Sequence, residues 1–446
     1  DSWQAGFLTP QQCDRLLAHA RKYRFNTLFV EVRRCADAYY RSSLEPRGPN
    51  IKDTEFDPLQ YLIQEAHEEP RIDIHAWVVV YRAWVSTRQR VPKDSLHVAR
   101  RHSEWLIVNQ SGDRNAPEGY YLDPALPEVQ NYLVAVFRDL IAKYDIDGLH
   151  LDYVRYPGSK WGYGKKSLEL WREASGTTGT PSPKDPAWNK WRRSQVTALV
   201  RRTYGELATQ RPGALLSAAT ITWGGLEMGY EKSSTMTEAL QDWVGWLEEG
   251  IIDVACPMNY KRGHIARQAG DFTEWTRATV RAAENRSAAI GIAGWLNTTA
   301  HVIQQMGEAR RTGADGVALF SYQSPTKSSQ KQEECLAQIS KGLFVSDAPV
   351  PEASWKNEEG LVFGRLYTGS RDTPGYRVRL EPVAATGDIR ETTTDQNGYY
   401  LFPRLSPNRY RLDAVTNDEK LTGRATFSIR AGQALRRDLR VPELTP

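Results

Sequence analysis

The chain has few of the residues and motifs that define several large classes of protein. Its 446 residues include only four cysteines, Cys13, Cys35, Cys256 and Cys335, and these form no CxxC or Cys/His pattern. The spacing argues against a structural zinc site. Cys256 lies in an apolar stretch and is expected to be a buried thiol. A disulfide between Cys13 and Cys35 remains an alternative for a chain that folds in an oxidising compartment.

Long apolar runs and a strong net charge are also absent. No stretch approaches the roughly 20 apolar residues of a membrane-spanning helix, so no membrane span is expected. The 58 Lys and Arg residues nearly balance the 54 Asp and Glu residues, which gives a formal net charge of +4. This small value gives no reason to expect nucleic acid as a partner, because proteins that bind it carry clustered basic charge. The chain begins at Asp1 rather than methionine, so earlier removal of a signal or an anchor is one alternative, and the sequence neither shows nor excludes export.

The sequence instead alternates short apolar stretches with amphipathic ones. The expected strands are Asn26–Arg33, Ile72–Tyr81, Trp105–Asn109, Gly148–Leu151, Leu215–Thr222, Ile251–Tyr260, Ala288–Trp295 and Gly316–Gln323. The expected helices are 10–24, 58–69, 127–143, 187–210, 235–249, 266–284, 299–312 and 328–341. Eight such units over roughly 340 residues predict a (β/α)8 TIM barrel. A doubly wound open sheet is the alternative, but no GxGxxG or P-loop motif is present to begin one.

The pattern changes after Phe344. Residues 345–359 are rich in proline and polar side chains, so they are predicted to be a linker between a barrel at 1–344 and a second domain at 360–446. Short alternating strands separated by turns predict a small all-β sandwich there. This sandwich has no cluster of catalytic residue types and is expected to be an accessory domain. Its strands are Gly360–Gly364, Tyr376–Pro382, Tyr399–Phe402, Tyr410–Val415 and Ala425–Ile429.

One strand combines apolar residues with an acid at its end. Residues two apart in a strand share a face, so His150 and Asp152 point one way and Leu149 and Leu151 the other. Catalytic residues of parallel barrels lie at the carboxyl ends of strands. A buried aspartate that only holds a helix or a loop is the alternative.

Several motifs resemble the glycosyl-hydrolase-like family 10 of bacterial proteins. They are Phe29–Arg33, His75–Trp77, Tyr81–Arg82, Tyr121–Gln130, Tyr144–Pro157 and Pro257–Tyr260. The resemblance covers about residues 1–340 and implies a TIM-barrel enzyme related to the α-amylase and α-galactosidase barrels. Some members act on the glycan strands of peptidoglycan. The family often has Gln where Glu31 stands and Asp where Tyr153 stands.

A second resemblance covers the tail. Thr393–Phe402 and Leu405–Leu412 resemble the carboxypeptidase regulatory-like, transthyretin-like sandwich. That module is usually structural or adhesive and is common in exported proteins. The resemblance implies a secreted, periplasmic or cell-surface protein.

Glycoside hydrolysis needs two carboxyl groups, one ionised and one protonated. The first resemblance implies Asp152 as the nucleophile, because related barrels place theirs at the end of the fourth strand. A nearby cation would keep it ionised, and Arg33 or Arg155 could supply the charge.

The identity of the general acid stays open at this point. Glu227 and Glu231 follow the fifth strand in a glycine-containing loop that could fold inward. Glu31 lies on the first strand. The alternatives are exposed loop glutamates in the first two cases and a structural partner of Arg33 in the third.

Polar and aromatic residues near strand ends are predicted to contact sugar. Neither an HExxH motif nor a third ligand accompanies His75 and His150, so hydrogen bonding to sugar hydroxyls fits better than metal binding, with satisfied core histidines as the alternative. No cofactor is expected. The predicted substrate-binding residues are Arg33, His75, Trp77, Tyr81, His150, Tyr153, Arg155, Trp223, Asn259, Tyr260, Trp295 and Tyr322.

The sequence therefore predicts a glycoside hydrolase that cleaves a bacterial polysaccharide or cell-wall glycan. One alternative is an inactive carbohydrate-binding protein on a hydrolase-like barrel. Another is a different barrel enzyme, such as a lyase or a metal-dependent hydrolase, because one fold can host many chemistries.

Overall fold

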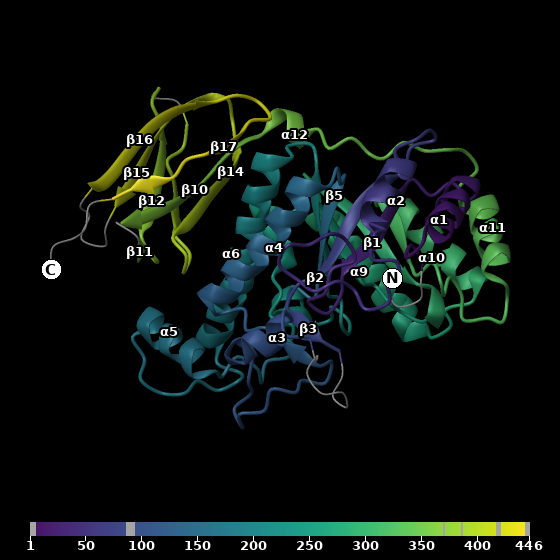
Figure 1. The fold of residues 1–446 in the computed structure, drawn as a ribbon, viewed down its shortest axis with the longest axis horizontal. Coiled ribbons are helices and arrows are strands. Elements are labelled where there is room, and N and C mark those ends of the chain that lie inside the picture. Colours follow the sequence, from purple (N-terminus) through teal and green to yellow (C-terminus); the bar gives the residue numbers. More distant parts are fainter. Residues whose placement is uncertain (1–5, 86–93, 369–370, 385–386, 416–420, 442–446) are drawn as a thin grey trace.

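The computed structural model describes residues 6–85, 94–368, 371–384, 387–415 and 421–441, and one curled parallel sheet lies at its centre (Figure 1). Its strands, in hydrogen-bonded order, are β1 (Thr27–Arg33), β2 (Asp73–Val79), β5 (Gly148–Asp152), β6 (Leu215–Thr220), β7 (Val254–Pro257), β8 (Ser287–Ala293) and β9 (Gly316–Phe320). All neighbours in this sheet pair in parallel. Their carboxyl ends therefore lie along one edge.

This sheet has seven strands, whereas the sequence predicted eight. The predicted strand Trp105–Asn109 is wrong, since Trp105 ends a 3-10 helix, η1 (Ser103–Trp105), and Leu106 forms only an isolated antiparallel bridge with Leu122. Leu106 and Ile107 are buried, and the N–H of Ile107 donates to the carbonyl oxygen of Tyr121 in a small antiparallel sheet of β3 (Arg82–Trp84) and β4 (Tyr120–Tyr121). β2 consequently pairs directly with β5. No ladder joins β9 to β1 among the described residues, so the sheet curls without closing.

Helices cover the outer face of the sheet, and proline marks the first turn of four of them: α1, α2, α4 and α6. Proline suits this position because its missing N–H would have no partner there. The helices before the C-terminal strands are α1 (Pro10–Lys22), α2 (Pro58–Ala66), α3 (Val98–Arg101), α4 (Pro127–Lys143), α5 (Lys165–Ser175), α6 (Pro186–Gln210), α7 (Ser234–Thr237), α8 (Trp243–Glu249), α9 (Ala266–Ala282), α10 (Thr299–Thr312) and α11 (Gln332–Leu343).

The predicted helix 235–249 is two helices. Leu240 has a φ of 52°, which interrupts the helix after α7. Asp242 then caps α8, because its side chain accepts a hydrogen bond from the N–H of Gly245.

Two further sheets follow α12 (Trp355–Glu358), a short helix within the predicted linker. One contains β11 (Arg371–Asp372), β10 (Gly360–Thr368) and β14 (Tyr399–Leu405), with β17 (Ala434–Arg436) and β18 (Leu439–Arg440) paired to β10. The other has the order β13 (Arg390–Thr393), β12 (Arg377–Pro382), β15 (Asn408–Val415) and β16 (Leu421–Ile429). Both contribute to one apolar core. We call them the C-terminal sheets.

The first C-terminal sheet packs on α6 (Figure 1). Gly205 of α6 lies against the ring of Phe363, and a Cβ atom at this glycine would come within 2.4 Å of that ring. Only a residue without a side chain permits such a close approach.

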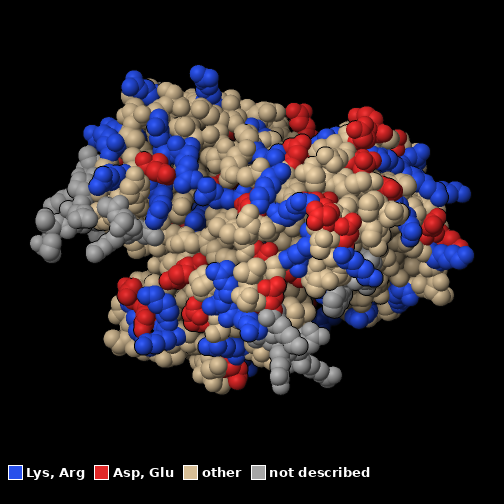
Figure 2. Space-filling model, viewed as in Figure 1, with Lys and Arg blue, Asp and Glu red and all other residues tan. Residues whose placement is uncertain are grey.

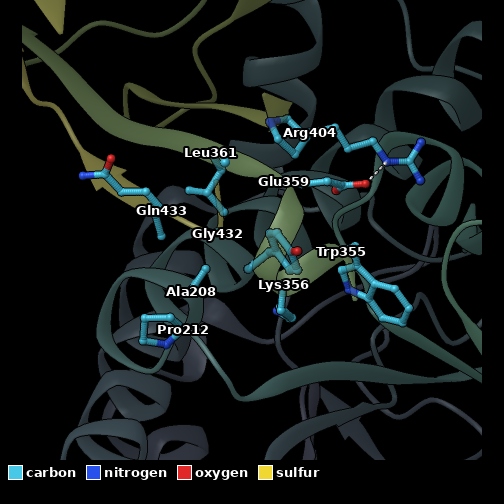
Figure 3. Close-up of a pocket in the computed structure, with 13 residues that line it drawn as sticks. Ala208, Pro212, Trp355, Lys356, Glu359, Leu361, Arg404, Gly432 and Gln433 are labelled. Carbon is cyan, nitrogen blue, oxygen red and sulfur yellow. Dashed lines mark ion pairs between the residues drawn. The ribbon is translucent and has the colours of Figure 1, made fainter. Parts of the chain in front are cut away.

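Charged contacts at the amino ends of the parallel strands hold the same junction together. Asp253, just before β7, accepts a hydrogen bond from Trp355 Nε1 at 2.7 Å and pairs with Lys356 Nζ at 2.8 Å. Arg286, just before β8, pairs with Glu359 at 2.6 Å. Figure 3 shows Trp355, Lys356 and Glu359 together at a pocket in this junction. The C-terminal sheets therefore attach away from the carboxyl edge of the parallel sheet.

The Cys13–Cys35 disulfide is not formed, and all four cysteines are free and buried. Cys13 Sγ lies 3.3 Å from the carbonyl oxygen of Phe7. Burial raises the pKa of both thiols to about 12. In the part of the chain that the structure describes, no helix has the length and apolar character needed to cross a membrane.

Candidate active site

Asp152 is the last residue of β5 and is buried at the carboxyl edge of the sheet. Trp77 Nε1 donates a hydrogen bond to its Oδ2 atom at 3.1 Å, and the backbone N–H of Tyr153 donates to Oδ1 at 2.7 Å. Burial raises the pKa of Asp152 above its usual value, while the positive charges of Arg82 and Arg155 oppose this shift. A donor on each oxygen and two nearby cations suit the ionised form of the carboxyl.

Tyr153 lies between two guanidinium groups. Arg82 Nη1 donates to the Tyr153 hydroxyl at 2.7 Å, and the guanidinium carbons of Arg82 and Arg155 lie 3.9 and 4.8 Å from the ring centre. The backbone of Tyr153 has a φ of 51°, a conformation that residues other than glycine rarely adopt. Such backbone strain clusters at functional sites. The sequence prediction included Tyr81–Arg82 among the motifs of the family resemblance but did not name Arg82 as a site residue.

Replacing Arg82 with glutamine is expected to move the acidic limb of the pH–activity profile to higher pH. Arg82 is the largest of the influences that lower the pKa of Asp152, so its removal lets burial raise that pKa further. An Asp152 that must be ionised to act would then lose activity earlier as the pH falls. The measurement is kcat/KM against pH for wild type, Arg82→Gln and, as a control, the exposed Arg277→Gln. Superimposable acidic limbs would contradict this role of Arg82.

Arg155 is fixed by a carboxylate that the sequence prediction also missed. Its Nη2 atom donates to both oxygens of Glu118 at 3.0 and 2.9 Å, and the Tyr121 hydroxyl donates to the same carboxylate at 2.7 Å. Burial alone would raise the pKa of Glu118, but Arg155 and Tyr121 hold it below its usual value. Glu118 is thus an anionic partner of Arg155 and is poorly suited to donate a proton.

Two exposed tryptophans connect to Asp152 through different neighbours. Trp223 and Trp295 are 39% and 38% exposed. The guanidinium carbon of Arg155 lies 4.9 Å from the Trp223 ring, whereas Trp295 lies 5.4 Å from Phe320, which in turn lies 5.9 Å from Trp77. Exposed flat rings of this kind can stack on sugar faces.

Tyr260 belongs to the same cluster as Trp295. Their ring centres are 4.9 Å apart. Burial raises the pKa of the Tyr260 hydroxyl, and the negative charge of Asp152 adds to this shift.

Of the three candidates for the second carboxyl, only Glu31 lies inside the curled sheet. It is 4% exposed and pairs in register with Trp77, the residue that binds Asp152. Glu227 and Glu231 are exposed, and Glu227 Oε1 lies 3.6 Å from Arg267 Nη2 in a surface ion pair. The loop that carries them does not bury either carboxyl.

The prediction that Arg33 binds sugar or acts on Asp152 is wrong. The register of β1 shifts between Glu31 and Arg33, so Arg33 pairs with Val78 and points to the outer face of the sheet. An extra residue of this kind reverses the alternation of a strand. Arg33 is wholly buried there and forms an ion pair with Glu45 at 2.7 Å.

His75 and His150 are enclosed and share one serine hydroxyl. Their Nδ1 atoms lie 3.4 and 2.9 Å from Ser217 Oγ. Burial lowers the pKa of His75 to about 4 and that of His150 to about 3, so both rings are neutral at ordinary pH. A Cβ at Gly148 would come within 2.4 Å of the His75 ring. This packing matches the alternative of satisfied core histidines, and the predicted sugar contacts of both residues are not supported.

Three more predicted ligands face other parts of the fold. Tyr81 and Asn259 are fully buried, and Asn259 Nδ2 donates to the carbonyl oxygen of Phe272 on α9. Neither side chain is exposed to solvent in this structure, so the predicted sugar contacts of these two residues are not supported. The hydroxyl of Tyr322 lies 2.9 Å from His19 Nδ1, so this side chain is directed toward α1.

Within the described ranges, no group of three or more His, Cys, Asp or Glu side chains is placed to hold a metal ion.

The fold and the site together define a glycoside-hydrolase-like protein. A parallel α/β sheet carries a buried acid at its carboxyl edge, with exposed aromatic rings beside it. Residues 3–298 match the family model described as glycosyl hydrolase-like 10, and the chain belongs to this family.

Two relatives carry glycosyl hydrolase names. Glycosyl hydrolase YngK of Bacillus subtilis (strain 168) is 26% identical over 430 residues, which cover 90% of this chain and 79% of YngK. Glycosyl hydrolase DigH of Escherichia coli (strain K12) is 24% identical over 266 residues, which cover 55% of this chain and 56% of DigH. The match therefore spans little more than half the length of the DigH relatives.

Solved structures support the fold. The PgaB (BpsB) glycoside hydrolase domain from Bordetella bronchiseptica gives a TM-score of 0.53 at 12% identity, covering 74% of this chain and 92% of that one. α-L-Fucosidase isoenzyme 2 from Paenibacillus thiaminolyticus gives 0.52 at 12% identity, covering 74% of this chain and 46% of that one.

Proposed function

We propose that the protein hydrolyses glycosidic bonds in a bacterial polysaccharide or cell-wall glycan, with Asp152 as the central carboxyl. The observation that carries the proposal is the position of this acid: it ends β5 at the carboxyl edge and holds a donor on each oxygen. Membership of a hydrolase-like family supports the reaction class. The resemblance of the tail to an exported module supports a secreted, periplasmic or cell-surface location.

In this proposal Asp152 acts as the anion and Glu31 as the proton donor. β1 and β5 flank β2, and Glu31 is in register with Trp77 and, through it, with His150, which lies two residues before Asp152. Carboxyl groups of inverting glycosidases are roughly 6.5–9.5 Å apart and those of retaining ones about 5–5.5 Å. The distance between the two carboxyl groups in a glycan complex therefore distinguishes the two outcomes. Arg82 and Arg155 stabilise the charge on Asp152.

Trp223 and Trp295 are proposed to stack on sugar rings. Replacing either with alanine is expected to raise KM roughly 2- to 10-fold, because a lost aromatic contact is worth about 0.5–1.5 kcal/mol. The matched control is Met228→Ala, which removes a side chain 70% exposed on the same loop as Trp223. KM values for both tryptophan variants equal to that of the control would contradict the stacking role.

The test of the reaction is release of reducing ends from a panel of bacterial glycans, including peptidoglycan stripped of its peptides. The proposal expects release from at least one of them. Binding without release from any glycan would instead assign the carbohydrate-binding alternative. Activity that disappears on chelation would point to a metal-dependent enzyme.

A further inference from the structure

The positive charge of the chain is concentrated in its C-terminal part. Residues 360–446 contain 14 Lys and Arg against 10 Asp and Glu, so they carry the whole formal net charge of +4. Thirteen of these 14 basic residues are arginine. Residues 1–359 are balanced. The guanidinium group presents a planar set of donors that matches a carboxylate, which an ammonium group does not.

Several of these arginines share the outer face of the sheet β13-β12-β15-β16. Arg379 pairs in register with Glu391 on one side and Asp413 on the other, and Asp413 pairs with Arg424. Register partners in a sheet point to the same face, so these four side chains form a row across it. Arg409 lies on the same face, four residues before Asp413. We call this surface the charged face.

Ion pairs hold the row in place. Arg424 Nε lies 2.7 Å from Asp413 Oδ1, and Arg411 Nε lies 3.1 Å from Asp413 Oδ2. The side chain of Arg424 is nevertheless 50% exposed, and Arg409 is exposed. The guanidinium groups are therefore ordered and still reachable from solvent.

The charged face points away from the rest of the molecule. The alternate residues Val378, Leu380 and Leu412 are buried in the core between the C-terminal sheets. The other C-terminal sheet packs on α6. Figure 2 shows blue side chains spread over the part of the molecule that holds these strands.

We propose that the charged face binds an acidic polysaccharide, at a site separate from Asp152. Arginine pairs with carboxylates through two parallel hydrogen bonds, and the exposed carboxylate of Glu391 can accept hydrogen bonds from sugar hydroxyls. A polysaccharide that carries a few carboxylates and many hydroxyls can bind both the arginines and the carboxylate of this face. The face is less suited to nucleic acid, since its own carboxylates repel a dense row of phosphates. A lipid surface also fits less well, because the four side chains of the row are charged, whereas aromatic and apolar side chains are the ones that insert into lipid.

The test is affinity electrophoresis in gels that contain polygalacturonate or, as the neutral polymer, dextran. The variant Arg379→Gln/Arg409→Gln/Arg424→Gln is compared with Arg277→Gln/Arg281→Gln/Arg311→Gln, which removes the same charge from exposed positions on α9 and α10. Polygalacturonate is expected to retard the wild-type protein and the triple variant on α9 and α10. Dextran is expected to retard neither protein. The charged-face variant should bind about tenfold more weakly, because it loses three of the positive charges that attract the polymer. Added NaCl should weaken wild-type binding.

Three outcomes would overturn the proposal. In the first, polygalacturonate retards the two triple variants equally. In the second, dextran retards the wild-type protein as strongly as polygalacturonate does. In the third, the wild-type protein binds duplex DNA more tightly than polygalacturonate. If the charged-face variant fails to fold, Arg409→Gln alone is used, because the structure shows no ion pair for this side chain among the described residues. It should show a smaller loss in the same direction. Binding is the only readout, so the outcome is independent of hydrolysis.

Discussion

Replacing Glu45 with alanine is expected to lower the free energy of unfolding by about 3–5 kcal/mol, the cost of breaking a buried ion pair by removing one partner. The side chains of Arg33 and Glu45 are both 0% exposed and lie 2.7 Å apart. Arg33 also donates to the carbonyl oxygens of Val79 and Val80, and the Tyr132 hydroxyl donates to Glu45 at 2.6 Å. Loss of Glu45 leaves a buried guanidinium without its anion.

Urea unfolding of the variant measures this effect. The control Glu55→Ala removes an 89% exposed carboxylate from the same loop and should change stability by less than about 0.5 kcal/mol. The double variant Arg33→Met/Glu45→Leu should recover much of the loss, because apolar residues can replace a buried pair. If the Glu45→Ala protein is as stable as wild type, the buried Arg33–Glu45 ion pair does not stabilise the fold.

Glu31→Gln is expected to reduce kcat about 10²- to 10⁴-fold, the usual contribution of a general acid. The glutamine amide keeps the size of the side chain, but it is too weak an acid to transfer a proton to the leaving group. Glu31 is buried inside the sheet, in register with Trp77, which binds Asp152. KM should change little, because the tryptophans that are proposed to bind sugar remain.

The matched controls are Glu227→Gln and Glu231→Gln, which alter exposed glutamates and should leave kcat near the wild-type value. A large loss in Glu227→Gln with full activity in Glu31→Gln would move the acid to the loop after β6. Full activity in all three variants would refute the assignment of the acid to any of these glutamates.

Much of the fold was predictable because its signals are local. Apolar stretches of strand length, proline at helix starts and the change of pattern near Phe344 all reflect backbone geometry and burial over a few residues. The predicted helices at Pro127–Lys143 and Thr299–Thr312 match α4 and α10 at both ends. Asp152 was found in the same way, as the polar end of an apolar strand.

The incorrect predictions depend on contacts distant in sequence. Strand alternation placed Arg33 on the inner face, but a single irregularity after Glu31 reverses its direction. The apolar run at Trp105–Asn109 has the composition of a strand, and only the packing around it decides otherwise. Arg82 and Glu118 lie in or beside the irregular segment between β2 and α4, where no periodicity marks a residue as functional.

The most direct test of the account compares wild type with Asp152→Asn for release of reducing ends from the glycan panel. The variant keeps the shape of the side chain and loses its charge. The account predicts that release falls about 10²- to 10⁴-fold while glycan binding persists. The asparagine amide can accept only one of the two hydrogen bonds that Asp152 accepts, so the unfolding temperature falls but the protein remains folded at the assay temperature. Equal release by the two proteins would contradict the central role of Asp152.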